Sequence, residues 1–406
     1  MTATSATNQR RRPPSKFRVA TERSVRAHRF ALLCVGVYFA VRLVGLAVLS
    51  VFTNAHQLAM TSTLSKWDGE WMLGLARYGY GGVPPWFTDA NGVHTDFTAY
   101  AFFPGYPWLV RAVAILPGIS PFAAAMIVNV LAGALAAVAI GRLGQHCATR
   151  VSPQVRASQE QAPIVGLILV ALFAATPMSV VLNMAYTEAV FCAAAAWALV
   201  GVTERRWLLA GFCALGAGVV RPTGVAVIAV VMLAAFLGRR DGRRAWVAVA
   251  IAPLGYLGYL ALVAAKTGSL DGWFQVQTSG WNTRIDGGRA TWRFLVDSLG
   301  SDSTFAAVAT ALIIVSVITL LGWSIADRVP WPVLVYGALV VASILLSDGL
   351  MMSRARLLLP AFVLFIPVAL RIAARPRTEI AAMLTLVAVF SGWFGAHMLT
   401  VFEYAI

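Results

Sequence analysis

Charged residues are scarce in this sequence of 406 residues, in which Asp, Glu, Lys and Arg together account for 12%. A soluble domain contains about 25% of these residues. Hydrophobic residues make up 59% of the chain, which is more than a soluble fold needs for its core. The shortage of charge therefore excludes an ordinary soluble globular protein and favours a chain that lies mainly in lipid.

Cysteine and histidine are also rare, with four and five residues respectively. Their positions show neither metal-ligand spacing nor redox spacing. The chain also lacks a glycine-rich phosphate loop and a serine nucleophile elbow. These absences disfavour an enzyme that uses ATP or a nucleotide sugar, and we expect no metal and no cofactor.

Long apolar runs are the feature that the sequence has in abundance. A hydrocarbon core about 30 Å thick needs roughly 20 apolar residues per helical crossing. The runs are continuously apolar and do not alternate with polar residues, which favours helices over a transmembrane barrel. We expect spans at about 30–51, 121–141, 163–182, 185–203, 206–220, 222–238, 245–265, 304–324, 331–347, 355–371 and 380–402.

One further apolar segment, 101–117, contains prolines and an arginine and does not fit this pattern. It could be a full crossing, a re-entrant segment or a helix along the membrane surface. The expected fold is therefore an all-α polytopic membrane protein with eleven or twelve spans. Its first extracytoplasmic loop, 52–98, is long.

Positive charge exceeds negative charge, with 32 Lys and Arg against 17 Asp and Glu, a net charge of +15. Basic residues gather in the N-terminal tail and in short loops such as 239–244, as the positive-inside rule describes. This account replaces nucleic acid as the reason for the charge, and we expect no nucleic-acid partner. We predict a disordered, basic, cytoplasmic tail at 1–28 and an integral domain at 29–406 in the cell membrane. The segments near 186–188, 221, 267–303 and 347–354 then lie outside.

The first external loop carries the most informative motif, in which Trp67, Asp68, Gly69, Glu70 and Trp71 are consecutive. Aromatic rings can anchor a chain at the membrane interface or stack on sugar rings. A carboxylate among them is suited to accept a proton from a hydroxyl group. As the alternative, Asp68 and Gly69 form a turn or helix cap and Glu70 is merely solvated.

Residues 100–107 form a second aromatic motif that includes Tyr106. They either shape a sugar site or form an interfacial belt at a proline-broken helix entry. Residues 186–188, Tyr-Thr-Glu, open an expected span, and Glu188 is either a sugar ligand or a carboxylate favoured by the helix dipole.

Several arginines fall in external segments, against the positive-inside trend. An arginine held against a membrane needs an anionic partner, and its guanidinium fork fits a phosphate. Arg221 could instead pair with a carboxylate such as Glu188. Snorkelling anchors are the alternative for the others. The candidates for holding a lipid phosphate are Arg221, Arg284, Arg354 and Arg356.

Together these motifs resemble the PIG-V-like mannosyltransferases of the GT-C glycosyltransferase superfamily. The resemblance rests on residues 67–69 with 79–80, 102–107, 186–188 and 221–224, in this order. The chain differs from the family pattern at Thr223 and Gly105. The resemblance implies a GT-C-like helical bundle that uses a polyprenyl-phosphate sugar, with Asp68 at the position of the catalytic base.

We therefore expect a mannosyltransferase that works by inverting single displacement on the extracytoplasmic face, with polyprenyl-phosphate-mannose as donor. The composition favours a bacterial host, so the expected acceptor is a glycolipid or lipoglycan of the cell envelope. Asp68 is the expected base. The expected substrate-binding residues are Trp67, Glu70, Tyr106, Glu188 and Trp281.

Other readings stay open. An arabinose or glucose donor fits the same chemistry. A transporter or flippase for a lipid-linked or anionic solute would use the same arginines, but the sequence shows no internal repeat and no ionisable residue at mid-span. A scaffold without activity is a third reading, which the presence of Asp68 disfavours.

Overall fold

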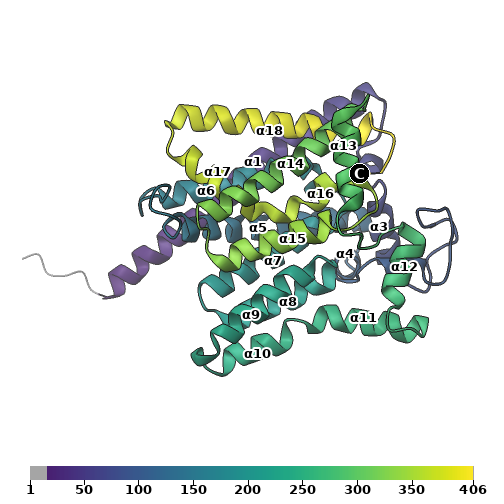
Figure 1. Cartoon of the computed structure of the whole chain (residues 1–406), viewed down its shortest axis with the longest axis horizontal. Coiled ribbons are helices and arrows are strands. Elements are labelled where there is room, and N and C mark those ends of the chain that lie inside the picture. Colours follow the sequence, from purple (N-terminus) through teal and green to yellow (C-terminus); the bar gives the residue numbers. More distant parts are fainter. Residues whose placement is uncertain (1–15, 406) are drawn as a thin grey trace, which may run out of the picture.

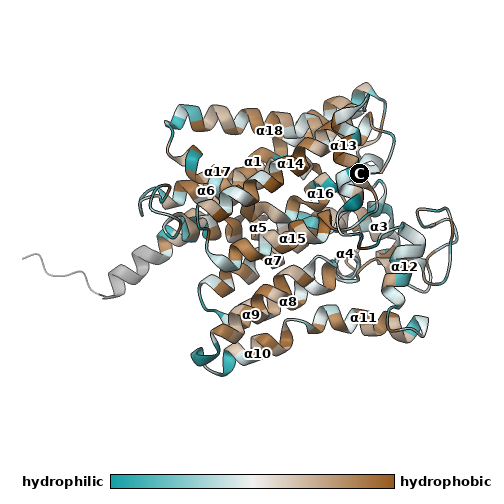
Figure 2. Cartoon of the chain, in the orientation of Figure 1, coloured by the Kyte–Doolittle hydropathy of each residue, from teal (hydrophilic) through white to brown (hydrophobic). Residues whose placement is uncertain are grey.

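The computed structural model describes residues 16–405, and residues 1–15 and 406 lie outside this range. Within this range all regular secondary structure is helical, apart from one isolated bridge between Ile285 and Ser347. Most of the longer helices run broadly along the long axis of the molecule (Figure 1). Hydrophobic residues cover their middle parts, and hydrophilic residues gather near the two ends (Figure 2).

The N-terminal half begins with one long helix and a loop region that contains short helices. Its elements are α1 (Lys16–Ala55), α2 (Met60–Thr63), α3 (Asp68–Tyr78), η1 (Thr98–Ala101), α4 (Gly105–Ala114), α5 (Pro121–Ala148), α6 (Ala162–Ala174), η2 (Ser179–Asn183) and α7 (Glu188–Thr203). The first loop is therefore largely ordered, and α3 and α4 lie at the same end of the bundle as the end of α1 (Figure 1).

The remaining helices complete the bundle and add α12 and α13 at the end where α3 lies (Figure 1). Their bounds are α8 (Trp207–Val220), α9 (Gly224–Leu237), η3 (Arg239–Asp241), α10 (Arg243–Ile251), α11 (Leu254–Thr267), α12 (Gly272–Trp281), α13 (Arg289–Gly300), α14 (Phe305–Ala326), α15 (Trp331–Leu345), η4 (Met351–Ser353), α16 (Arg354–Leu357), η5 (Leu359–Phe365), α17 (Ile366–Ala373) and α18 (Arg377–Thr400).

The number of full-length spans is smaller than the sequence predicts. Five helices in the described part are long and apolar enough to cross a membrane, or six if the bent pair 351–373 is one span. Five other predicted spans form shorter apolar helices, such as α8 and α9, with 14 residues each. A helix of fourteen residues rises only about 21 Å. The helices are short because glycine, proline and buried polar residues interrupt the predicted apolar runs. The chain is a multi-pass membrane protein with several short or broken helices.

The structure corrects one local expectation and decides between the alternatives left open for another segment. Residues 16–28, predicted to belong to a disordered tail, are the start of α1, which continues without a break into the first apolar run. Residues 101–117 contain only the ten-residue helix α4, which at about 15 Å is too short to cross. One side of α4 is exposed, at Trp108 and Leu109, and the other is buried at Tyr106 and Val110, as in a helix that lies along a surface.

The predicted separation of inner and outer loops is visible as two ends of the bundle. At one end Arg205 pairs with Asp241 at 3.1 Å, and Ser152 donates to the Asp327 carbonyl. At the other end the first loop contacts 185–187 and 399, and 284–286 contact 346–348. The loops predicted to share a side therefore do share one.

Small residues allow the central helices to approach closely. A Cβ atom on Gly166 of α6 would lie 2.5 Å from the Gly141 carbonyl oxygen of α5, and one on Gly144 would lie 2.8 Å from the Gly166 Cα. Lipid tails are as apolar as the helices, so packing of small residues is a main source of helix association in membranes.

A buried arginine ties α1 to the unwound segment that follows α6. Arg42 is 4% exposed. Its guanidinium donates to the Ala174 carbonyl at 2.8 Å, to Ser179 Oγ at 2.6 Å and to Asn183 Oδ1 at 3.3 Å. It lies well inside the span Ser24–Ala55, which corrects the expectation that no span carries an ionisable residue near its middle.

Replacing Gly166 by alanine tests the close α5–α6 contact. The new methyl group would force the helices apart, and overpacking of this kind costs about 1–3 kcal/mol. We expect a lower midpoint of thermal unfolding in detergent for Gly166→Ala. The matched control is Gly322→Ala on α14, where a Cβ would meet nothing within 4 Å. Equal midpoints for the two variants would contradict this account.

Candidate active site

Asp68 is the first residue of α3, and its side chain is 35% exposed. Acidic residues are favoured in the first turn of a helix by the macrodipole. The preceding residue, Trp67, has φ +54° and ψ −117°, a conformation that costs a non-glycine residue about 1–3 kcal/mol. The surrounding contacts therefore hold the chain in a turn that presents Asp68 at the end of the bundle.

The segment before α7 packs directly against this turn. The Ala185 N–H donates to the Leu64 carbonyl at 3.0 Å, and the Tyr186 hydroxyl donates to the Lys66 carbonyl at 3.1 Å. Gly69 allows a close approach here, because a Cβ at this position would lie only 3.3 Å from the Tyr186 ring. Two segments far apart in the sequence thus form one unit around Asp68.

A chain of four charged side chains lies at the centre of the site. Arg356 Nη1 is 2.5 Å from Asp68 Oδ2 and 3.9 Å from Glu188 Oε1. Arg221 Nη1 is 2.5 Å from the same Glu188 oxygen and 2.9 Å from Thr187 Oγ1. Glu188 is fully buried, and the two arginine side chains are each 9% exposed. The cluster is electrically balanced, with Asp68 as its accessible member.

Aromatic contacts support this cluster from one side. The Arg356 guanidinium lies over the Tyr186 ring at 5.0 Å from its centroid, an attractive arrangement for a cation. The Tyr186 hydroxyl donates to the Lys66 carbonyl, so Tyr186 acts as a wall and as a hydrogen-bond donor.

The structure brings together only some of the predicted site residues. Asp68, Glu188, Arg221 and Arg356 form the cluster just described. The ion pair of Arg221 with Glu188, which the sequence left open as an alternative to phosphate binding, is present. Glu70 is exposed and has no polar partner in the described part of the chain.

Arg354 and Arg284 lie outside the charge cluster and bind the segment 347–348. Arg354 is 2% exposed and donates to the carbonyls of Ser347 and Asp348. Arg284 is 73% exposed and pairs with Asp348 through Nε at 2.9 Å. Arg284 therefore joins the segment after α12 to the segment after α15, and Arg354 joins α16 to that same segment after α15; both lie outside the charge cluster.

The predicted aromatic ligands are spread around the site. Trp281 contacts Trp71 and Phe102 in an aromatic group, with ring centroids 6.1 and 5.4 Å apart. Trp67 is half-buried beneath the Lys66 ammonium group. Tyr106 is fully buried, and its hydroxyl has no hydrogen-bond partner within the described residues.

Sequence analysis missed two residues that shape the site. Tyr186 was read only as part of a motif, although its ring and hydroxyl contact both sides of the cluster. Lys66 precedes the tryptophan–aspartate pair, and its Nζ donates to the Leu399 carbonyl at the end of α18 at 2.7 Å. The scarcity of lysine in this chain was the only available signal for Lys66.

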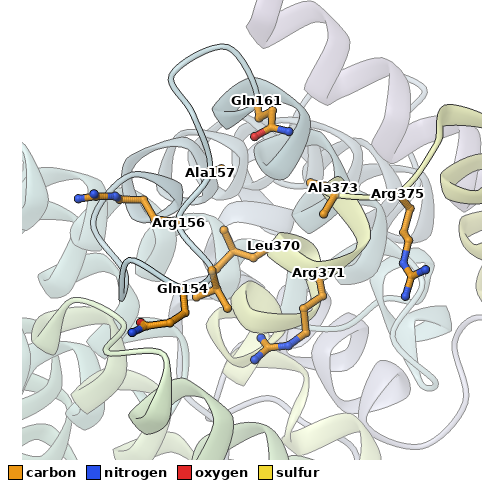
Figure 3. Close-up of a pocket in the computed structure, with 10 residues that line it drawn as sticks. Gln154, Arg156, Ala157, Gln161, Leu370, Arg371, Ala373 and Arg375 are labelled. Carbon is orange, nitrogen blue, oxygen red and sulfur yellow. The ribbon is translucent and has the colours of Figure 1, made fainter.

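Two cavities in the structure contain none of these site residues. One, of about 490 Å³, is lined by residues of 154–161 and 370–375. Its three arginines, Arg156, Arg371 and Arg375, point in different directions (Figure 3). The other, of about 880 Å³, involves the start of α1. No cluster of three or more possible metal ligands occurs among the described residues.

The chain matches no protein-family model and no curated protein. Among solved structures it is similar to the crystal structure of ArnT from Cupriavidus metallidurans bound to undecaprenyl phosphate. The TM-score is 0.51 at 14% identity, over 90% of this chain and 76% of ArnT. This similarity concerns the fold, and it agrees with the predicted all-α bundle of a membrane protein.

Removing the buried carboxylate should cost more stability than removing the accessible one. Glu188→Gln leaves Arg221 and Arg356 buried with only Asp68 as counter-charge, and breaking a buried pair in this way costs about 3–5 kcal/mol. Asp68→Asn keeps Glu188 between the two arginines and should cost less. Thermal unfolding of both variants in the same detergent measures the difference. A midpoint for Glu188→Gln at or above that of Asp68→Asn would contradict the central role of Glu188.

Proposed function

We propose that the protein is a membrane glycosyltransferase of GT-C type that uses a lipid-phosphate-linked sugar. The observation that carries this proposal is the accessible Asp68 carboxylate in contact with a buried arginine, Arg356. A glycosyl transfer from a phosphate donor needs a base for the acceptor and positive charge for the leaving phosphate. The fold similarity to ArnT, a structure bound to undecaprenyl phosphate, supports the same donor class.

The proposed reaction is a single displacement. The acceptor hydroxyl attacks the anomeric carbon, and Asp68 takes its proton. The bond between that carbon and the phosphate oxygen breaks, and its electron pair leaves with the lipid phosphate. The transition state has oxocarbenium character. A donor of one anomeric configuration therefore yields a product of the opposite configuration.

In this proposal Arg356 links proton removal from the acceptor to departure of the lipid phosphate. In the structure it is shared between Asp68, at 2.5 Å, and Glu188, at 3.9 Å. A donor phosphate entering beside Asp68 would compete for the same guanidinium, and charge-assisted bonds to phosphate are strong. When Arg356 turns to the phosphate, Asp68 loses its counter-ion and becomes free to accept a proton. Glu188 and Arg221 stay paired and form the buried floor of the site.

The finer assignment follows the resemblance to PIG-V-like mannosyltransferases. We propose mannose as the transferred sugar, polyprenyl-phosphate-mannose as the donor and a cell-envelope glycolipid or lipoglycan as the acceptor. The charge cluster would lie on the extracytoplasmic side, because the opposite end of the bundle carries the basic loops. Trp67, Trp281 and Tyr106 are proposed to line the substrate path, with Glu70 at its exposed edge.

The other two arginines receive more peripheral roles. Arg284, which is largely exposed, is suited to attract an approaching lipid phosphate. Arg354 is proposed to act on the phosphate only through the segment 347–348 that it holds in place. Arg42, the buried arginine within the α1 span, would also suit a flippase, but its guanidinium is occupied by Ala174, Ser179 and Asn183.

Replacing the proposed base gives the first test. Membranes that contain wild type, supplied with radiolabelled polyprenyl-phosphomannose, should transfer label to a glycolipid. We expect Asp68→Asn to lower the initial rate by about 10²–10⁴-fold, the usual contribution of general base catalysis. Asp96→Asn, an exposed aspartate of the same loop, is the control and should keep the wild-type rate. Equal rates for Asp68→Asn and wild type would remove Asp68 from the mechanism, and label that crosses vesicles without transfer would favour a flippase.

A conservative change at Arg356 tests the leaving-group role. Arg356→Lys keeps the positive charge beside Asp68 but loses the fork that binds phosphate through two nitrogens. We expect kcat to fall by about 10–100-fold, since removal of one preorganised contact to a developing charge costs this much or more. Arg284→Lys should leave kcat unchanged, because that side chain is exposed. A rise in KM with kcat unchanged in Arg356→Lys would show that the arginine binds the donor without stabilising the transition state.

A further inference from the structure

A second candidate binding site lies at the end of the bundle opposite α3. Its cavity, of about 880 Å³, is enclosed by the start of α1, the last turns of α5, the segment 149–159 and the first turns of α6. The start of α1 and the helix α6 lie at the end of the bundle opposite α3, the helix that begins with Asp68 (Figure 1). The site is therefore independent of the proposed transfer reaction.

The mouth of this cavity is strongly basic. Four arginines line it, Arg26, Arg29, Arg142 and Arg150, and Glu204 is the single carboxylate in the lining. That carboxylate is already neutralised by Arg142, whose Nη2 lies 2.6 Å from its Oε1. Arg150 Nη1 donates to the His146 carbonyl at 3.0 Å, which leaves its charge uncompensated.

Arg29 increases this excess of positive charge. Its side chain is exposed and has no partner of any kind in the described part of the chain. Arg29 and Arg150 thus place two uncompensated charges at one opening. Such a concentration of positive charge attracts an anion, and the attraction is strongest where low-dielectric walls surround it.

The walls of the cavity are apolar. Phe30 and Leu33 of α1, Val138 of α5, and Pro163 and Leu167 of α6 line it. Leu33 is 47% exposed, so the apolar wall opens outward on the side of α1 that faces the surroundings of the bundle. A small soluble anion would leave this wall uncovered, whereas a lipid would cover it with an acyl chain.

The cavity shown in Figure 3 makes a useful comparison. It also contains three arginines, but Arg371 is paired with Asp327 at 2.5 Å, and the guanidinium groups diverge. It is also only about 490 Å³ in volume. The larger cavity therefore differs in that it combines apolar lining residues with two arginines, Arg29 and Arg150, that have no carboxylate partner among the described residues.

We propose that the larger cavity binds an anionic glycerophospholipid from the membrane leaflet at this end. The headgroup phosphate lies between Arg29 and Arg150, and one acyl chain follows the wall formed by Leu33, Val138 and Leu167. Basic pockets between transmembrane helices suit lipid headgroups of this kind. The bound lipid joins α1 to α5 and α6.

The test is lipid retention by the purified full-length protein. Wild type is reconstituted in nanodiscs of phosphatidylcholine with a minor fraction of phosphatidylglycerol, extracted into mild detergent and analysed for bound lipid by mass spectrometry. We expect enrichment of phosphatidylglycerol over phosphatidylcholine. The double variant Arg29→Gln with Arg150→Gln should reduce this enrichment by about 25-fold, since each arginine near a membrane surface contributes about fivefold.

A matched control uses two arginines at the same basic end of the bundle that do not line the cavity. The double variant Arg243→Gln with Arg244→Gln, at the start of α10, removes the same charge and should retain phosphatidylglycerol as wild type does. Equal losses in both double variants would overturn the site, because the effect would then come from total charge. Displacement of the lipid by excess inorganic phosphate would also overturn it, because the apolar wall would then contribute nothing.

A steric variant keeps the proposal testable if the arginine variant does not fold. Leu33→Trp fills part of the acyl path and leaves every charge in place. It should reduce retention of phosphatidylglycerol at an unchanged gel-filtration profile. Retention equal to that of wild type would exclude the cavity as the lipid's location.

Discussion

The pairing of buried Glu188 with Arg221 and Arg356 is the interaction on which the rest of the site depends. Two arginines at the end of a membrane bundle are costly unless a carboxylate compensates them. Glu188 supplies this compensation at 2.5 and 3.9 Å and is fully buried while doing so. Because it neutralises the inner part of the cluster, Asp68 can remain at the surface with 35% of its side chain exposed. An accessible carboxylate next to a buried cation is the arrangement that the proposed transfer needs.

Broken helices make this arrangement possible. The chain is unwound between α6 and α7, where Ala185 and Tyr186 contact the turn before α3, and it is bent by 56° beside α16, which contains Arg356. Non-helical backbone at membrane depth is tolerated where protein covers it and satisfies its polar groups. Arg42 does this for the first break, by donating to Ala174 and Ser179. The short spans are thus a consequence of bringing polar residues to one end of the bundle.

The two ends of the molecule carry different kinds of charge. The end with α3 has alternating arginines and carboxylates in contact with one another, so its charges are largely compensated. The opposite end has arginines in excess, as at the mouth of the cavity near Arg29 and Arg150. The compensated charges at the α3 end suit chemistry on a substrate that carries its own phosphate. The excess of arginines at the opposite end suits lasting attraction of anionic lipid, so the two ends can act separately.

Composition and continuous apolar runs were sufficient to predict an all-α membrane bundle, because burial of such runs in lipid depends on hydrophobicity alone. Charge placement was sufficient to predict which loops share an end. The motif around Asp68 identified the accessible carboxylate. Only the tertiary structure decided that Arg221 and Arg356 meet Glu188, whereas Arg354 and Arg284 bind the segment at 347–348. All four arginines look alike in the sequence, and the partner of each depends on where a helix breaks, which long-range packing determines.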